Sequence, residues 1–356
     1  MPTQVKETTK PQNSETALGF AEIKASLRSQ IKTYKKRAAE VEAYLLKHPD
    51  EWGKFQSELN SEINAIFHDI MLFEKINYSK GQEEKVHKLK RIFINKIRHL
   101  FLKGPYNEWG FSKPLGYAGD FQMIDYIYQN NPTTTGFARL FDNYCMMSAI
   151  SVAVRNRKED FKRFITDFIK EKYTGHRLKI MDLASGPCRE LYEILLLDPS
   201  ISDKVTFDCY DHDARALEYA QNLLRGFGNI NFIKKNAVKI ALKKDISRLI
   251  DKQYDFIYST GLFDYFSAQI ATGVVHNLKA LLKPDEGVLA ISTARDKYSN
   301  PSLYYMEWSA DWNLVYRDEE EFKRIFREVG FIDDQLKIQY EQQGIMQYMI
   351  ATNKPK

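Results

Sequence analysis

Apolar residues recur at steps of three and four through the first hundred residues, which is the spacing of helices that bury one face. The pattern is clearest in the segment around Ile63, Ile66, Phe67 and Ile70. Pro49 and the polar stretch 77–82 interrupt it. The spacing predicts three helices, over residues 34–47, 55–74 and 83–101.

The same pattern divides the chain into three parts. Residues 1–17 are rich in Thr, Gln, Lys and Glu and are expected to form a disordered tail. Residues 18–174 are expected to form a helical N-terminal domain, which caps the rest of the protein, contributes to a substrate site and offers a surface for a homodimer. Residues 175–356 are expected to form a second domain, for which a chain of 356 residues has room.

After residue 175 the helical spacing gives way to short continuous apolar runs. The run 178–183 is typical of a buried parallel strand, and the small residues 184–186 after it allow close approach of a ligand to the backbone. A helix is predicted from near Cys188, and a second strand over 205–211. This alternation predicts an α/β fold with a Rossmann-like sheet.

The acid that ends the second strand indicates a nucleoside ligand. Asp211 lies 25 positions after Gly186 (211 − 186), close to the interval of about 20 residues at which a carboxylate meets ribose hydroxyls in dinucleotide folds. A dinucleotide fingerprint needs three glycines, G-x-G-x-x-G, and this turn keeps only Gly186. A nicotinamide cofactor is therefore disfavoured.

The sequence Asp182-Leu-Ala-Ser-Gly-Pro-Cys188 resembles motif I of the class I S-adenosylmethionine-dependent methyltransferases, with Ala184 and Cys188 departing from its glycines. Later segments agree with the family in order: strands over 230–235, 254–262 and 287–292, a Leu-Leu-Lys-Pro turn at 281–284, a helix within 318–331 and two closing strands over 335–340 and 345–352. The resemblance covers about residues 175–353. It implies a seven-stranded sheet, S-adenosylmethionine as the cofactor and a methyl acceptor as the partner.

The resemblance also implies a set of cofactor-binding residues. Asp182 is placed near the methionine part, Asp211 at the ribose hydroxyls and His212 against the adenine, where exposure at the surface is the plainer alternative. Asn236 and Ala237 are placed at the adenine as well. The predicted set is completed by Ala184, Ser185, Gly186, Ser259 and Gly261.

Four further blocks resemble a narrower group, the bacterial methyltransferases that make 3-hydroxy fatty acid methyl esters. The blocks are Gly116-Tyr-Ala-Gly-Asp120, Arg155-Asn156, Gly261-Leu-Phe-Asp-Tyr265, and Met306-Glu-Trp308 with Asp311-Trp312 and Tyr316-Arg317. Asp120 is also placed to cap the helix that follows it. The alternative is that Gly116 and Gly119 allow a tight loop, which places Tyr117 and Asp120 at the mouth of the cofactor site. Arg155 is expected to steer a carboxylate, either that of the cofactor or that of the acceptor.

Methyl transfer needs alignment more than acid–base catalysis. A carboxylate acceptor is already ionised near neutral pH, whereas a hydroxyl needs a base within hydrogen-bonding reach. We predict Asp264, Tyr265 and Glu307 as catalytic residues. Asp264 and Glu307 follow strand ends, although either could also simply bond a neighbouring backbone amide, and Tyr265 belongs to an aromatic concentration at the same edge. The aromatic residues Tyr305, Trp308 and Trp312 are predicted to line the acceptor pocket, with burial in a core as the even alternative.

The composition disfavours several classes of function but does not identify a binding partner. The net charge of +5 comes from runs that also fit solvated helix faces, so nucleic acid is disfavoured. Three cysteines without a C-x-x-C pair predict no metal site and no disulfide framework, as expected for a cytoplasmic protein. No apolar run is long enough for a membrane span.

Two other functions remain open from the sequence. One is methylation of protein or nucleic acid, with the basic helical domain as the docking surface. The other is a non-catalytic protein that binds S-adenosylmethionine through the degraded glycine turn. The leading prediction is methylation of a small molecule at a carboxylate or hydroxyl oxygen, with a fatty acyl group as one candidate.

Overall fold

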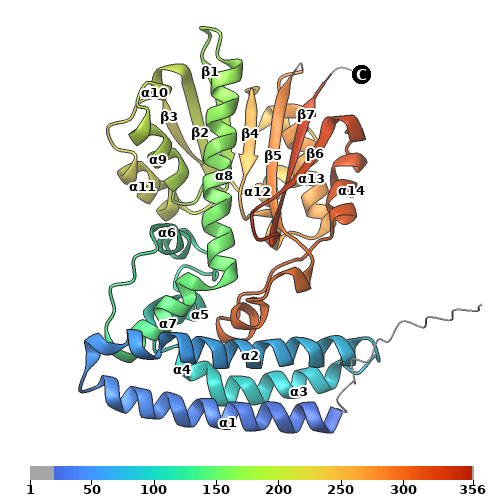
Figure 1. Ribbon diagram of the computed structural model, residues 1–356. Coiled ribbons are helices and arrows are strands. Elements are labelled where there is room, and N and C mark those ends of the chain that lie inside the picture. The colour runs from blue at the N-terminus through green and yellow to red at the C-terminus, as the bar shows by residue number, and fades with distance from the viewer. Residues whose placement is uncertain (1–19, 285, 355–356) are drawn as a thin grey trace, which may run out of the picture.

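The computed structural model describes residues 20–284 and 286–354, so the tail predicted for residues 1–17 lies outside the described residues. Three helices form a layer at the base of the molecule in Figure 1, and the three helices predicted from the spacing are confirmed. They are α1 (Phe20–Leu45), α2 (Gly53–Tyr78) and α3 (Glu83–Phe93), which continues through a π-helical turn (Ile94–Arg98) into α4 (His99–Phe101). A 3₁₀ turn, Pro49–Glu51, joins α1 to α2.

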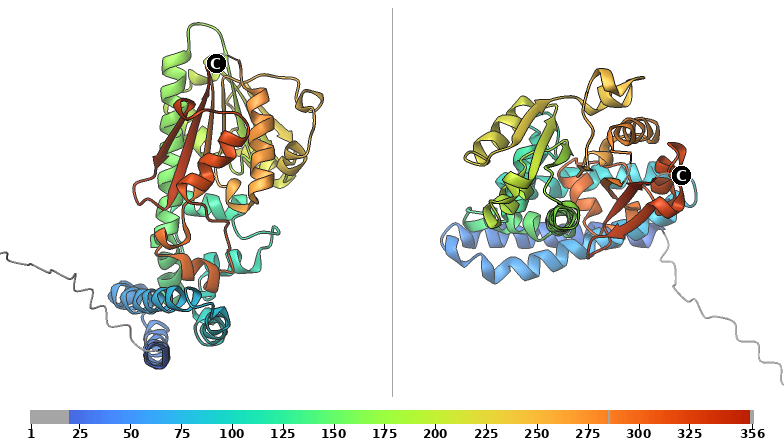
Figure 2. Two further views of the ribbon diagram at one scale, coloured as in Figure 1. Left: turned by 90° about the vertical axis from the view of Figure 1, so that its right-hand side faces the viewer. Right: turned by 90° about the horizontal axis from the view of Figure 1, so that it is seen from above.

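Four more helices connect this layer to the sheet: α5 (Pro105–Ser112), α6 (Phe121–Gln129), α7 (Gly136–Met147) and α8 (Ala149–Lys172). Helix α8 runs along one face of the sheet in Figures 1 and 2. Its Phe161 ring lies 5.4 Å from the ring of Tyr348, and its Phe168 ring lies 5.0 Å from that of Phe256. The helix therefore packs on the sheet as well as joining it to the helical layer.

The sheet has seven strands in the order β3-β2-β1-β4-β5-β7-β6. The strands are β1 (Leu178–Leu183), β2 (Val205–Asp211), β3 (Ile230–Lys234), β4 (Phe256–Ser259), β5 (Gly287–Ala294), β6 (Leu336–Tyr340) and β7 (Met346–Asn353). The first five are parallel, and β7 is antiparallel to both of its neighbours. The predicted α/β class and the closing antiparallel pair are both confirmed.

Helices cover both faces of the sheet. One face is covered by α8, α9 (Arg189–Leu197) and α11 (Ala214–Leu223), the other by α12 (Ala237–Ala241), α13 (Ala268–Leu281) and α14 (Glu319–Glu328). In β1, Ile180 packs into the first core and Met181 into the second. A parallel strand that is buried on both faces explains why its sequence is mainly apolar, with Lys179 and Asp182 as the exceptions.

The remaining elements are short. They are α10 (Ile201–Lys204), the 3₁₀ turns Ile246–Arg248, Phe263–Tyr265, Lys297–Ser299 and Asp333–Gln335, and a π-helical turn, Tyr305–Ser309. In the described parts of the chain, no helix combines the length and the apolar character that crossing a membrane requires.

Residues 297–312, which we call the descending segment, follow β5 and reach down to the helical layer (Figure 1). Lys297 Nζ lies 2.5 Å from a carboxylate oxygen of Glu74 on α2, and the Trp308 ring packs edge-on against Phe93 of α3 at 5.7 Å. Arg98 Nε donates to the Trp308 carbonyl oxygen at 2.9 Å. Through these contacts the descending segment packs against the helical layer and connects it to the domain that contains the sheet.

Candidate active site

A cavity of about 360 Å³ opens at the carboxyl ends of β1, β2 and β4. Doubly wound sheets bind their ligands at this edge. One side of the cavity is formed by the turn after β1 and the end of β2, and the other by the loop after β4 and the descending segment. Loop 116–120 and helices α6 and α8 contribute the rest of the wall.

The turn after β1 and the acid that ends β2 are in direct contact. The Gly186 amide donates to Asp211 Oδ2 at 3.0 Å, and the Ser185 amide donates to the Tyr210 carbonyl at 3.1 Å. Asp211 Oδ1 accepts from the Asp213 amide at 2.9 Å. Oδ1 also lies 3.3 Å from His212 Nδ1, whereas Oδ2 keeps a further lone pair and can still accept a hydrogen bond from a ligand hydroxyl. The predicted juxtaposition of Gly186 and Asp211 is confirmed.

The turn itself has a left-handed backbone without three glycines. Ala184 and Cys188 have φ values of 60° and 51°, close to the 52° of Gly186. A left-handed conformation costs a residue with a Cβ roughly 1–2 kcal/mol. The turn therefore keeps its shape where the family's usual glycines have been replaced.

Two acids lie buried beneath this turn. The Asp182 side chain is 2% exposed, and its Oδ2 has no hydrogen-bond partner. The hydroxyl oxygen of Ser185 is also buried without a partner. Burial raises the pKa of Asp182 well above its usual value, and the neighbouring Glu190 carboxylate raises it further. Glu190 lines the cavity and accepts from the Tyr258 hydroxyl at 3.1 Å. Buried polar atoms without partners are uncommon. Ser185 and Glu190 line the cavity and fit a polar or cationic ligand group, whereas Asp182 does not line it.

Sequence reasoning missed Glu190. Its signal was an acid in the first turn of the helix that follows the β1 turn, a position favoured by the helix dipole alone. Glu190 follows the motif by only two residues, but the sequence does not show that its side chain lines the cavity.

The predicted adenine residues lie one strand further along the same edge. The Lys235 amide donates to the Asp211 carbonyl at 2.8 Å, which places Asn236 and Ala237 just beyond the end of β2. Asn236 is exposed, and its Oδ1 caps α12 by accepting from the Val238 amide at 2.8 Å. Neither residue lines the cavity described above, so their contact with adenine stays a prediction.

Loop 116–120 covers the cavity with Tyr117, whose ring lies 5.9 Å from the His212 ring. A Cβ at Gly119 would come within 2.5 Å of the Tyr265 hydroxyl, so only glycine allows this approach. Asp120 does not line the cavity: its carboxylate is buried and accepts from the Gln122 and Met123 amides. The plain capping interpretation of Asp120 is therefore right, and its placement at the mouth was wrong.

The arginine in the cavity is Arg157, not Arg155. The Arg155 guanidinium donates to the carbonyls of Ile127 and Met146 and does not line the cavity. Arg157 is 3% exposed, lines the cavity, and leaves its Nε without a partner. A terminal nitrogen of Arg157 lies 3.8 Å from Asp264 Oδ2. The role predicted for Arg155 therefore cannot be filled by that residue.

The loop after β4 supplies the far wall. Asp264 Oδ1 accepts from the Ala294 amide at 2.6 Å, which leaves Oδ2 directed towards Arg157. Burial raises the pKa of Asp264, and the Arg157 charge partly opposes that shift. A Cβ on Gly261 would lie 3.1 Å from the Arg157 guanidinium, so the glycine leaves room for it. Tyr265 and Trp312 complete this wall, joined by a 2.8 Å hydrogen bond from Trp312 Nε1 to the Tyr265 hydroxyl.

Five other predicted residues lie outside this cavity: Asp182, which is buried beneath the turn after β1, and Ser259, Tyr305, Glu307 and Trp308. Ser259 donates to the Leu183 carbonyl at 2.7 Å and ties β4 to β1. Tyr305 donates to Asn107 Oδ1 at 2.5 Å, and Trp308 packs among the helices of the base. Glu307 accepts from the Tyr316 hydroxyl at 3.0 Å, and burial raises the pKa of its carboxyl. Placing Tyr305, Trp308 and Glu307 in the main pocket was therefore wrong.

One group of metal-ligating side-chain types lies beneath the turn. The ligand atoms of Asp182, Cys188 and Cys209 are all within 4.8 Å of one another and buried. The contact with Cys209, together with burial, raises the pKa of Cys188, which favours neutral thiols. The prediction that the protein uses no metal stays a prediction.

The sheet order and the crevice at its carboxyl edge define the fold of a class I S-adenosylmethionine-dependent methyltransferase. The chain belongs to the family described as "Putative methyltransferase", which it matches over residues 112–351. It is therefore a methyltransferase, and the predicted enzyme class is confirmed.

The chain is similar to several solved structures, and the first of those described here shares its fold. A protein from Bordetella parapertussis, described as a possible exported protein, aligns over 97% of this chain and 100% of its own with a TM-score of 0.53 and 17% identity. An O-methyltransferase family protein from Burkholderia thailandensis aligns over 56% and 60% with a TM-score of 0.39 and 17% identity. Magnesium protoporphyrin IX methyltransferase from Synechocystis, with bound S-adenosylmethionine, aligns over 58% and 84%, with a TM-score of 0.41 and 11% identity. No curated protein matches the chain significantly.

Proposed function

We propose that the protein transfers the methyl group of S-adenosylmethionine to an oxygen of a small acceptor, a carboxylate or a hydroxyl carried on an apolar body. The observation that carries this proposal is Arg157, a buried guanidinium at the base of a mainly apolar cavity. A buried charge needs a partner, and Asp264 at 3.8 Å is a loose one. An acceptor carboxylate is a natural second partner.

The cavity residues fit the cofactor. Asp211 offers the free lone pair of its Oδ2 to a ribose hydroxyl. Asp182 lies beneath the turn and does not line the cavity, so the methionine part of the cofactor would meet Glu190 and Ser185, which do line it. Asn236 and Ala237 are placed at the adenine, with His212 beside it. When bound, S-adenosylmethionine supplies an electrophilic methyl group on a sulfonium.

The acceptor side of the cavity is apolar apart from Arg157 and Asp264. Its apolar wall comes from α6, α8, the segments after β4 and β5, and the start of β7, and consists of Ile124, Ile150, Val154, Leu262, Met306, Leu314 and Met346. An acceptor with a hydrocarbon body would lie along this wall with its charged end at Arg157. A fatty acyl acceptor of the 3-hydroxy acid type is the finer form of this proposal.

The protein's own part in the reaction is orientation. Arg157 would hold the carboxylate so that one oxygen attacks the methyl carbon in line as the carbon–sulfur bond breaks and its electron pair stays on sulfur. A carboxylate loses no proton, so no base is needed. For a hydroxyl acceptor, Asp264 Oδ2 is the nearby acceptor of the proton. Tyr265 is not suited to that role, because a phenol is protonated near neutral pH.

The proposal is tested by incubating the protein with S-adenosylmethionine and a panel of straight-chain carboxylic acids, 3-hydroxy acids and their methyl esters. We expect S-adenosylhomocysteine and a methyl ester from the free acids, and no carboxyl methylation of the esters. Turnover of a protein or of nucleic acid with none of the acids would contradict the proposal, as would cofactor binding without turnover of any acceptor.

The pH dependence of cofactor binding should report the contact between His212 and Asp211. His212 Nδ1 lies 3.3 Å from Asp211 Oδ1, and this hydrogen bond raises the His212 pKa. The charged contact is therefore present at low pH and is lost as pH rises through the raised pKa. Because protonated His212 occupies Asp211, we expect cofactor affinity to rise a few-fold from about pH 6 to about pH 8.

Calorimetry at three pH values measures this effect, with His212→Gln as the control. The variant retains any pH dependence that belongs to the cofactor itself, so the difference between the two proteins isolates His212. Parallel pH profiles for the two proteins would show that His212 does not compete for Asp211.

A further inference from the structure

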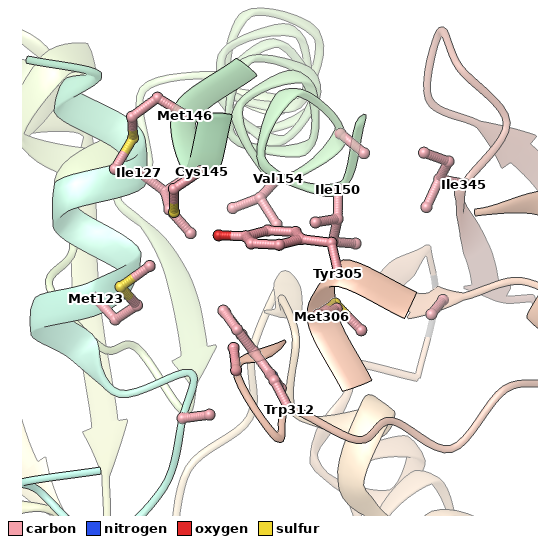
Figure 3. Close-up of a cluster of buried hydrophobic side chains, with 14 of the residues drawn as sticks. Met123, Ile127, Cys145, Met146, Ile150, Val154, Tyr305, Met306, Trp312 and Ile345 are labelled. Carbon is pink, nitrogen blue, oxygen red and sulfur yellow. The ribbon is translucent and has the colours of Figure 1, made fainter. Parts of the chain in front are cut away.

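A second, much smaller cavity of about 20 Å³ lies directly behind the main one. Four side chains line both cavities and so form a partition between them: Ile150, Val154, Met306 and Trp312. Figure 3 shows these four side chains gathered with Met123, Ile127 and Cys145. The partition brings together helix α8 and the descending segment.

The rear cavity is apolar and closed. Met123, Ile127 and Cys145 line it, all 3% exposed or less, and the hydrogen bond from Tyr305 to Asn107 lies at its wall. An opening of this size holds about one water-sized group, and a water there would find few polar partners. A methyl or methylene group suits it better.

The members of the partition differ in mobility. Ile150 and Val154 are β-branched residues on a helix, which restricts their rotamers, and Trp312 is held by its hydrogen bond to Tyr265. Met306 is unbranched, 1% exposed and has three rotatable side-chain bonds. It is therefore the part of the partition that can be changed or displaced with the least disturbance.

We propose that Met306 sets the upper length of the acceptor's apolar part, and that the rear cavity is the space a longer chain enters when Met306 is moved or shortened. This inference rests on the proposed function, since it assumes an acceptor whose charged end lies at Arg157. The acceptor's tail then points along the apolar wall towards the partition. Met306 is a specificity-determining residue and not a catalytic one.

The test compares the wild-type protein with Met306→Ala on straight-chain carboxylates of increasing length. Shortening Met306 joins the two cavities, so the longest acceptor used efficiently should gain about two carbons. Each added methylene that is buried should raise kcat/KM roughly fourfold, from about 0.8 kcal/mol per methylene. Cofactor affinity should not change.

Two further variants separate this effect from a general loosening of the core. Met349→Ala makes the same change at a residue of 0% exposure in the other core, which lines neither cavity, and should leave the length profile unchanged. Ala310 lines only the rear cavity, so Met306→Ala with Ala310→Val should return the longest efficient chain towards that of the wild type.

The same series is also measured as binding, by calorimetry of the carboxylates against protein loaded with S-adenosylhomocysteine. If the wild type binds the acids without methylating them, the proposed function fails. The dependence of binding on chain length in the wild type and in Met306→Ala then still tests the role of Met306. A folded Met306→Ala variant with the wild-type length profile in both measurements would overturn the inference. Failure of the wild type to bind any of the acids would overturn it as well.

Discussion

Replacing Arg157 with methionine is expected to lower kcat/KM for carboxylate acceptors by about 10- to 150-fold while leaving affinity for the cofactor unchanged. Hydrogen bonds to a charged group contribute about 1.5–3 kcal/mol, which corresponds to that range. Methionine keeps an unbranched apolar stem but removes the guanidinium that lies 3.8 Å from Asp264. Steady-state kinetics and calorimetry with S-adenosylmethionine measure the two effects separately.

Three variants control this prediction. Arg155→Met removes an arginine from the same helix whose guanidinium bonds only backbone carbonyls, and should keep the acceptor profile. Arg157→Lys should recover part of the activity, because it restores a positive charge. Arg157→Met with Asp264→Asn removes both buried charges, so its inactivity could not be ascribed to an unpaired Asp264. Full turnover of carboxylates by Arg157→Met would show that this residue does not hold the acceptor.

Replacing Asp125 with alanine is expected to lower the free energy of unfolding by about 3–5 kcal/mol, the usual cost of removing one partner of a buried ion pair. Asp125 lies on α6 at 0% exposure and accepts two hydrogen bonds of 2.7 Å from Arg189. Tyr219 and Gln129 bond the same carboxylate. This single carboxylate ties α6, which follows loop 116–120, to α9 and α11.

Denaturant unfolding with and without S-adenosylmethionine measures the loss. The double variant Asp125→Ala with Arg189→Met should lose less stability than Asp125→Ala alone, because it leaves no unpaired guanidinium. Asp334→Ala, at an exposed position before β6, should stay within about 0.5 kcal/mol of the wild type. An Asp125→Ala protein as stable as the wild type would show that the network does not anchor α6.

The sheet could be predicted from the sequence because its strands are short apolar runs that end in recognisable turns and acids. β1 and β2 are buried almost throughout, so most of their residues are apolar, and this is visible in the sequence. The contact between Gly186 and Asp211 follows from parallel strands that end at one edge. The apolar runs and the residues that end them are local features of the sequence, and each indicates a single structure.

The arginine was misassigned for a geometric reason. Arg155 and Arg157 are two residues apart on α8, and at 3.6 residues per turn such side chains point about 200° apart. One faces the carbonyls at the end of α7, and the other faces the cavity. Motif resemblance located the helix but did not determine which face of the helix turns to the ligand.

Tyr305 and Trp308 were misplaced because a local sequence pattern does not determine the path of the long connection that follows β5. Tyr305 and Trp308 follow β5 by more than ten residues, and the descending segment carries them down to the helical layer. Among residues 305–312, only Met306 and Trp312 line the cavity. Long-range packing of residues 297–312 on α2, α3 and α4 decides this, and the sequence pattern does not show it.

Calorimetry with S-adenosylmethionine and with NAD, on the wild type, Asp211→Ala and Asp213→Ala, tests the central claim most directly. The account predicts micromolar binding of S-adenosylmethionine by the wild type, no binding of NAD, and at least a roughly tenfold weaker Asp211→Ala, equivalent to about 1.4 kcal/mol. Asp213→Ala, which removes the neighbouring cap of α11, should bind nearly as the wild type does. Equal affinity in the wild type and Asp211→Ala would contradict a cofactor held between Gly186 and Asp211.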